Sequence, residues 1–142
     1  MAQPRIRGYD DSDESAVLAL WQAAGIDRPW LDLRAEIAEK LKRDRELFLV
    51  AEVAETGQIV GAVMGAYDGR RGWVYHLAGQ PTRQRQGVGR ELMAALEQAM
   101  PAAGVQKINL QVRADNAHVV AFYERLGYLD ERLTGMGKWL RR

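Results

Sequence analysis

The chain has 142 residues and a formal net charge of +1, with 47% hydrophobic and 27% charged residues. These values predict one soluble globular domain over residues 1–142, and the near-zero charge argues against a general nucleic-acid binder. The lack of cysteine excludes disulfides, thiolate metal sites and a cysteine nucleophile. No apolar run approaches the roughly 18 residues of a membrane span, and the first residues lack a signal-peptide core, so we expect a cytoplasmic protein.

The amino-terminal third predicts one short strand and two helices. The strand lies near residues 6–7, and Asp11 or Ser12 is the expected cap of the first helix, which Gly25 ends. Residues 28–33, RPWLDL, are predicted to form a loop because a proline restricts them. The second helix is indicated by apolar residues at helical spacing, namely Leu33, Ile37 and Leu41.

Three β-forming runs follow. Residues 46–53 and 59–68 are joined by a short turn that contains glycine, which is typical of an antiparallel β-hairpin. Residues 72–79 predict a third strand. After a basic loop at residues 83–92 comes an amphipathic helix, and residues 107–113 then alternate in polarity like a strand with one wetter face.

The carboxy-terminal part predicts one more helix and one more strand. Asn116 is a suitable helix cap, Gly127 fits the position just after the helix, and residues 133–140 are a candidate final strand. Because residues 73–113 form a strand–helix–strand unit, its two strands should be parallel. The hairpin before this unit is antiparallel. We therefore predict the α/β (α+β) class with a mixed sheet.

The basic loop, RQRQGVGREL, has the composition of an anion site. Free backbone N–H groups at a helix start converge on an anion, and arginine adds forked donors. A tight turn that merely needs flexible residues is the alternative. A nucleoside-triphosphate loop is disfavoured because Gly89 is followed by Arg90 and Glu91 rather than Lys-Ser or Lys-Thr. A dinucleotide fingerprint is also weak, because the third glycine is missing.

Two motifs carry a resemblance to a known family. One is Gln84-Arg85-Gln86-Gly87-Val88-Gly89, and the other is NAHVVAFYERLGY at residues 116–128. In this order and separation they resemble the GNAT superfamily of acetyl-CoA-dependent N-acetyltransferases. The segments RPWLDL, LFLVAEV and VMGAYDGRRG extend the resemblance to small bacterial YpeA-type acetyltransferases, over nearly the whole chain.

The resemblance implies a fold, a reaction and a co-substrate. The GNAT fold has a mostly antiparallel mixed sheet, flanked by helices, with a central pair of parallel strands that splay apart. The implied reaction moves an acetyl group from acetyl-CoA directly to a primary amine of a small molecule, peptide or protein. A non-catalytic acyl-CoA-binding sensor is the alternative. We expect no metal, since no histidines and carboxylates have ligand spacing.

The resemblance also assigns the cofactor-binding residues. Backbone N–H groups of residues 85–90 would hold the pyrophosphate, and the pantetheine arm would lie along residues 77–79 like an added strand. A backbone N–H near Leu77 or Ala78 is the expected oxyanion donor. The full set is Leu77, Ala78, Gly79, Gln84, Arg85, Gln86, Gly87, Val88, Gly89, Arg90, Asn116 and Tyr123.

Two of these residues have a second interpretation. Tyr123 resembles the family's general acid, whose phenol would protonate the leaving thiolate, although the spacing alone also fits packing beside Phe122. Asn116 is explained by helix capping, and the family uses the same position to bind the cofactor arm.

The sequence offers several candidates for the general base and for the residues of the acceptor pocket. Candidate bases are Glu52, Tyr75, His76 or ordered water, and strand alternation should put Tyr75 and His76 on opposite faces. His118 is expected on the surface. Candidate acceptor residues are Trp30, Tyr67, Asp68 and Trp73, with core packing as the alternative for both tryptophans. The expected partner is an amine, with no nucleic acid or membrane, and a homodimer is left open.

Overall fold

The computed structural model describes residues 4–83 and 86–141. Its contacts divide the chain into two compact units, Met1–Gln111 and Val112–Arg142. The first unit holds a five-stranded sheet in the spatial order β1-β2-β3-β4-β5. In chain order its main elements are β1 (Arg5–Gly8), α1 (Glu14–Ala23), α2 (Leu33–Leu41), β2 (Phe48–Glu52), β3 (Ile59–Tyr67), β4 (Gly72–Gly79), α3 (Val88–Ala99) and β5 (Ile108–Asn109). The second unit holds α4 (Ala117–Arg125).

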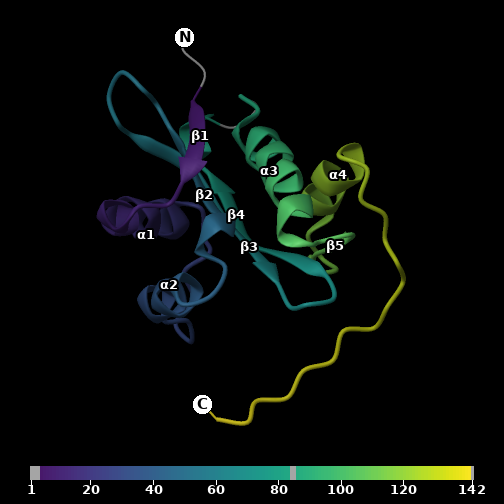
Figure 1. Cartoon of the computed structure of the whole chain (residues 1–142). Coiled ribbons are helices and arrows are strands. Elements are labelled where there is room, and N and C mark those ends of the chain that lie inside the picture. Colours follow the sequence, from purple (N-terminus) through teal and green to yellow (C-terminus); the bar gives the residue numbers. More distant parts are fainter. Residues whose placement is uncertain (1–3, 84–85, 142) are drawn as a thin grey trace. The chain divides into compact units, whose positions relative to one another are not determined.

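Helices cover both faces of the sheet in the first unit. Helices α1 and α2 lie on one face and α3 lies on the other (Figure 1). The core between the sheet and the first two helices includes the fully buried Trp21, Ile37 and Phe48. Trp21 and Phe48 stack with ring centroids 6.1 Å apart. Large apolar side chains on both partners therefore fix α1 and α2 against this face.

The packing of α3 depends on a residue without a side chain. A Cβ atom added at Gly61 in β3 would lie 2.5 Å from Val88 Cγ1 and 2.9 Å from Leu92 Cδ1. Both Val88 and Leu92 belong to α3 and are buried. Because no real Cβ fits at these distances, glycine lets the helix approach the sheet closely and holds its first turn near the end of β4.

The strand pairing confirms the predicted antiparallel hairpin of β2 and β3, and β3 pairs with β4 in the same sense. The ladder between β3 and β4 contains an irregularity. Ala62 pairs with Ala78 and Met64 pairs with Tyr75, so β4 holds one residue more than β3 between these pairs. This arrangement is a β-bulge. His76 in the bulge has a φ of 53°, which is uncommon for a residue with a side chain.

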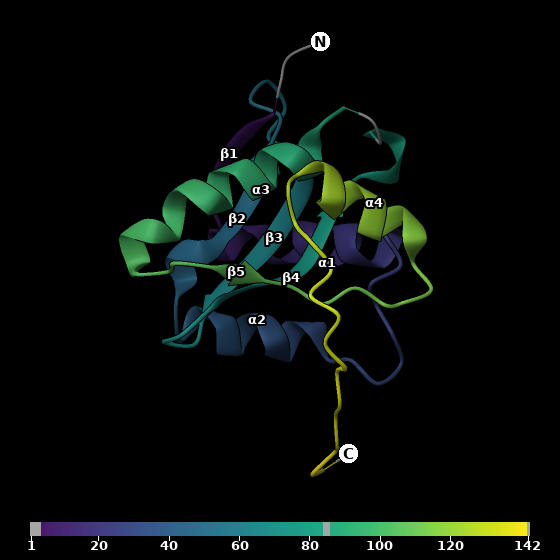
Figure 2. The same cartoon turned by 90° about the vertical axis from the view of Figure 1, so that its right-hand side faces the viewer.

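The predicted parallel pair is present and short. Strands β4 and β5 pair through Gly72 with Ile108 and through Trp73 with Asn109. The strand expected over residues 107–113 is therefore reduced to two residues, whereas β4 continues to Gly79 beyond the last pair. Figure 2 shows β5 as a short strand beside β4. The early end of this ladder agrees with the splayed strand pair of the predicted fold.

The helix ends follow the sequence with one shift. Asp10, rather than Asp11 or Ser12, caps the first helical turn, accepting a hydrogen bond from the Ser12 N–H at 3.0 Å. In the second unit, Asn116 caps α4 as predicted, with its side chain accepting from the Val119 N–H at 3.3 Å.

The predicted final strand at residues 133–140 is wrong. These residues have no regular secondary structure, and Leu133, Met136 and Leu140 are 80%, 92% and 88% exposed. Two glycines, at positions 135 and 137, interrupt the apolar pattern, and glycine weakens a strand interior. Among the described residues no helix is both long and apolar enough to cross a membrane.

Candidate functional site

The start of α3 has the geometry of an anion site. The helix follows Gly87, which has a φ of 80° and supplies no side-chain cap. The first N–H that bonds within the helix is that of Glu91, which donates to Gly87 O at 2.9 Å. The preceding amides of Val88, Gly89 and Arg90 therefore lack partners one turn back, as at any helix start. A Cβ at Gly87 would meet nothing within 4 Å, so the space around this position is open.

The described residues of the basic loop that precede Gly87 form a turn. Gln84 and Arg85 lie outside the described residues. The Gln86 N–H donates to Arg83 O at 3.2 Å, and the Arg83 guanidinium donates to the Gln86 side-chain oxygen at 3.3 Å. The Gln86 amide thus closes a turn, which leaves the helix-start amides as the stronger candidates for a phosphate.

The end of β4 lies next to this helix start. Ala78 is buried in the core that α1 and α2 cover. Gly79 pairs with Gly61 across the ladder, and a Cβ on Gly79 would reach Val88 only at 3.8 Å. Since the β5 ladder ends at Trp73, residues 77–79 lie beyond the paired part of that edge. An extended ligand could therefore pair with their main chain.

The aromatic residues of α4 are packed within the second unit. Tyr123 is 8% exposed, and its ring meets Phe122 at 5.0 Å and Tyr128 at 5.7 Å, both edge-to-face. Burial raises the pKa of Tyr123 to about 12. The phenol therefore stays protonated at neutral pH. His118 lies exposed in the first turn, as predicted.

His76 has two partners from different helices. Its Nε2 lies 2.8 Å from Glu36 Oε1 of α2. Trp21 of α1 donates its indole N–H to the His76 backbone carbonyl at 3.0 Å, and the two rings lie 5.1 Å apart. His76 therefore faces α1 and α2.

The expected alternation of Tyr75 and His76 is wrong because of the bulge. Tyr75 and Ala78 lie opposite Met64 and Ala62, which belong to one core on the α1 and α2 face. Positions three apart share a face here only because β4 carries an extra residue. Tyr75 and His76 therefore both belong to this face. Tyr75 is half exposed, and partial burial raises its pKa, with a smaller contribution from Asp68.

Glu36 was missed by the sequence reasoning, although a signal was present. It lies three residues after Leu33 and four before Lys40, and both of these are buried. Helical spacing therefore placed a carboxylate on the side of α2 that faces the protein. The contact with His76 depends on the bulge, and no local sequence pattern predicted the bulge.

Three other predicted residues have structural partners. Glu52 accepts from Arg5 at 2.9 Å and from Arg7 at 3.0 Å, and these guanidinium groups lower the pKa of Glu52. Asp68 accepts from the Trp73 indole at 3.0 Å and from the backbone N–H groups of the next turn. These bonds account for Glu52, Asp68 and Trp73 without a substrate.

The two remaining acceptor candidates lie apart from this network. The Tyr67 hydroxyl donates to Gly69 O at 3.2 Å, and the Tyr67 N–H donates to Asp44 at 2.6 Å. Trp30 is 67% exposed in the loop between α1 and α2, so it is a surface residue rather than a core one.

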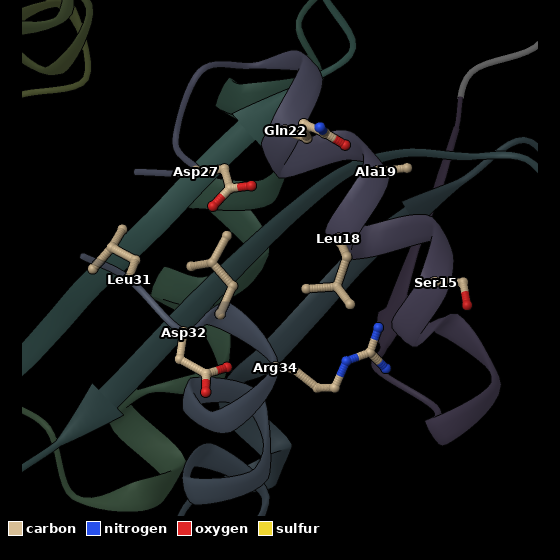
Figure 3. A pocket seen from close by; sticks show the side chains of 9 residues that line it. Ser15, Leu18, Ala19, Gln22, Asp27, Leu31, Asp32 and Arg34 are labelled. Carbon is tan, nitrogen blue, oxygen red and sulfur yellow. The ribbon is translucent and has the colours of Figure 1, made fainter. Parts of the chain in front are cut away.

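A hollow of about 610 Å³ lies between α1 and α2 (Figure 3). It is open to solvent and has both apolar and charged side chains on its walls. The lining residues are Ser15, Leu18, Ala19, Gln22, Asp27, Leu31, Asp32, Leu33 and Arg34. Asp32 also caps α2, accepting from the Ala35 N–H at 3.0 Å.

Metal ligation finds no support in the described part of the chain. Residues 4–83 and 86–141 contain no group of three or more histidine, aspartate or glutamate side chains that could hold an ion. The chain itself has no cysteine.

Sequence comparison finds a matching family and full-length relatives. The model of the "Acetyltransferase (GNAT) family" matches residues 14–128. An acetyltransferase of Sodalis glossinidius, SG1711, is 42% identical over 137 residues, covering 96% of this chain and 94% of its own. An acetyltransferase of Yersinia enterocolitica, YE1169, is 43% identical over 135 residues, covering 95% of this chain and 94% of its own.

Structure comparison finds the same fold in solved acetyltransferases. The ribosomal-protein-S18-alanine N-acetyltransferase of Escherichia coli superposes with a TM-score of 0.74 at 27% identity, covering 87% of this chain and 76% of that one. Ard1 of Thermoplasma volcanium superposes with a TM-score of 0.75 at 23% identity, covering 90% of this chain and 84% of that one. At this identity, the likeness to Ard1 supports the fold alone.

Proposed function

This chain is an acyltransferase that belongs to the acetyltransferase (GNAT) family, and we propose that it transfers an acetyl group from acetyl-CoA to a primary amine of a small molecule or peptide. The observation that carries the proposal is the start of α3. There a glycine-led helix without a side-chain cap presents the amides of its first turn, which have no intrahelical partner, beside the end of β4.

The amides of residues 87–90 would bind the pyrophosphate. Helix N-termini favour anions because unpaired N–H groups and the helix dipole act together. Gly87 suits this task, since its left-handed backbone turns the chain into the helix without a side chain in the way. Arg90, in the first turn of α3, adds a positive charge near the same position.

The end of β4 would hold the acyl arm. Bound acetyl-CoA supplies an activated thioester carbonyl. Leu77, Ala78 and Gly79 would pair with the extended arm through their main chain, because the ladder to β5 has ended before them. A backbone N–H of Leu77 or Ala78 would then stabilise negative charge on the carbonyl oxygen.

Tyr123 would supply the proton to the departing sulfur. Burial raises its pKa to about 12, so it carries its proton at neutral pH. Asn116 would use its amide N–H groups on the cofactor arm, because its side-chain oxygen is occupied by the Val119 N–H.

The acceptor is proposed as a primary amine that enters from the α1 and α2 face. The Escherichia coli structural relative is named for acetylation of an alanine on a ribosomal protein, which makes a peptide with a free amino-terminal alanine a useful probe. A polyamine such as spermidine is a suitable small-molecule probe. The proposal places the reaction in the cytoplasm and involves no nucleic acid.

The test follows release of free thiol from acetyl-CoA with each probe amine. Turnover by the wild type, with a loss of at least about tenfold in Tyr123→Phe, is the expected result for removal of a general acid. Calorimetry with coenzyme A measures binding separately. Binding without turnover on any amine would favour the sensor alternative, and absence of binding would overturn the proposal.

A further inference from the structure

We propose that His76 and Glu36 form a catalytic pair that removes a proton from the acceptor amine. His76 Nδ1 is the base, and Glu36 is a positioning residue that acts through the imidazole ring. This inference rests on the proposed acetyl transfer and names the group that completes it.

The tautomer of His76 follows from its contact with Glu36. An ionised carboxylate can only accept hydrogen bonds, and Glu36 Oε1 lies 2.8 Å from His76 Nε2. In the neutral ring the hydrogen is therefore on Nε2, and Nδ1 keeps its lone pair. When Nδ1 takes up a proton, the resulting imidazolium remains bonded to the carboxylate, which stabilises it.

Nδ1 is not sealed from solvent. In the described part of the chain, every buried side-chain nitrogen or oxygen of a non-exposed residue has a hydrogen-bond partner. Nδ1 has none there, so it must reach solvent. The His76 side chain is 19% exposed and that of Glu36 is 38% exposed, so the pair is anchored inside and open at one edge.

The backbone of His76 has an unusual conformation, which directs the side chain toward α1 and α2. Its φ of 53° lies in the left-handed region, which non-glycine residues seldom occupy outside functional sites or turns. The buried Trp21 fixes the carbonyl at 3.0 Å. A regular strand would have turned His76 toward α3, whereas the bulge turns it toward α1 and α2.

The pair also lies next to the proposed acyl position. His76 directly precedes Leu77, where the proposed pairing with the acyl arm begins. Trp21 of α1 is neutral, and Tyr75 is the adjacent titratable residue on β4. Glu36 is thus the charged group that contacts the ring, from α2.

Nδ1 takes one proton from the ammonium group of the acceptor, and the electron pair of that N–H bond stays on nitrogen. This pair forms the C–N bond with the acetyl carbonyl carbon, and the C–S bond breaks with its electrons moving to sulfur. Tyr123 gives its proton to the sulfur and is reprotonated by the second proton lost from nitrogen, which leaves an amide and a thiol. His76 then returns its proton to water.

The test compares thiol release by variants with an alanine-starting tripeptide amide and with spermidine. His76→Gly suits the positive φ and should lower kcat about 100-fold with KM changed less than about threefold, which is within the range for a lost general base. Added imidazole should restore part of the rate. His76→Asn, which also tolerates this backbone, should be equally slow and not rescued.

Glu36 is tested by a double-mutant cycle. Glu36→Ala should lower kcat about tenfold in the wild-type background and have no effect in the His76→Gly background, because its action passes through the ring. Glu39→Ala removes another carboxylate of α2, which pairs with Arg43 at 3.1 Å, and should leave the rate unchanged. Additive losses would show a merely structural role and overturn the inference for Glu36.

A readout independent of turnover is ¹⁵N NMR of the imidazole rings. The chain has two histidines, and His118→Asn identifies the His76 signals. The wild type should show the hydrogen on Nε2, and Glu36→Ala should lose this preference. A ring with its hydrogen on Nδ1 would overturn the pair. A wild type idle with both amines would overturn the proposed function and the base role together, whereas full activity of His76→Gly would overturn the pair alone.

Discussion

The indole N–H of Trp21 donates a hydrogen bond to the backbone carbonyl of His76 at 3.0 Å. Trp21 is fully buried on α1, and the carbonyl belongs to the bulged residue of β4. One side chain therefore connects the helix layer to the irregular point of the strand. Removal of this donor would leave the carbonyl without its indole partner.

Trp21→Phe tests this connection. We expect the free energy of unfolding to fall by about 1–3 kcal/mol, because a partly buried acceptor loses its partner, with a further loss from the smaller ring. Urea unfolding monitored by circular dichroism measures it. Trp30→Phe is the matched control, since Trp30 is 67% exposed, and should change stability by less than about 0.5 kcal/mol. Equal effects of the two changes would contradict the assignment.

Gly61→Ala tests the close approach of α3 to the sheet. The new methyl group would lie 2.5 Å from Val88 Cγ1, so the helix or the strand must shift, at a cost of about 1–3 kcal/mol. Thermal and urea unfolding measure the change. Gly8→Ala provides the control, because a Cβ there meets nothing within 4 Å. If Gly61→Ala left the free energy of unfolding unchanged, the first turn of α3 would be able to shift at little cost.

Asp68 should contribute to stability in acid. Hydrogen bonds from the Arg71 N–H, the Trp73 indole and the Arg70 N–H lower the pKa of Asp68 to about 2. A group with a lowered pKa stabilises the fold above its unfolded value, near pH 4, and loses this contribution as the pH falls through about 2. Asp68→Asn should therefore flatten stability over this interval, measured by urea unfolding at several pH values. An unchanged profile would contradict the prediction.

Gly87→Ala should weaken binding of coenzyme A about tenfold in calorimetry. Alanine at the φ of 80° is strained by about 1–2 kcal/mol, and the loop would relax away from the arrangement that presents the amides. Gly25→Ala introduces the same strain at a φ of 79° after α1 and should leave the affinity for coenzyme A unchanged. Equal losses would point to general destabilisation instead.

The ratio of wild-type to Tyr123→Phe turnover should be constant from neutral pH up to about pH 10, where a free tyrosine is half ionised. Burial raises the pKa of Tyr123 to about 12, so the phenol remains a donor throughout that interval. Steady-state rates at saturating substrates measure the ratio. A ratio that falls toward one as the pH rises to 10 would show that the phenol ionises earlier.

Most of the fold was predictable because its elements carry their own local signals. Asn116 caps a helix as its place in the sequence predicts, and β4 runs from Gly72 to Gly79 as the turn residues indicate. One failure comes from tertiary pairing. The strand at residues 107–113 shortened to Ile108–Asn109 because its register ends after two pairs.

The site was predictable to a smaller extent. The glycine-led helix start could be located from Gly87 and the residues around it. Glu36 could not, because its contact with His76 joins positions 40 residues apart through a bulge. The ion pairs of Glu52 with Arg5 and Arg7 were equally invisible to local patterns.

The additional residue in β4 makes strand length a determinant of what the enzyme presents to its acceptor. A single deletion at position 76 or 77 would restore an uninterrupted two-residue repeat, in which Tyr75 and Ala78 keep the α1 and α2 face and the one residue left between them turns toward α3. Homologues that differ only by this insertion would keep the architecture and yet display different functional groups. Acceptor preference could then diverge by indel, without any substitution in the pocket.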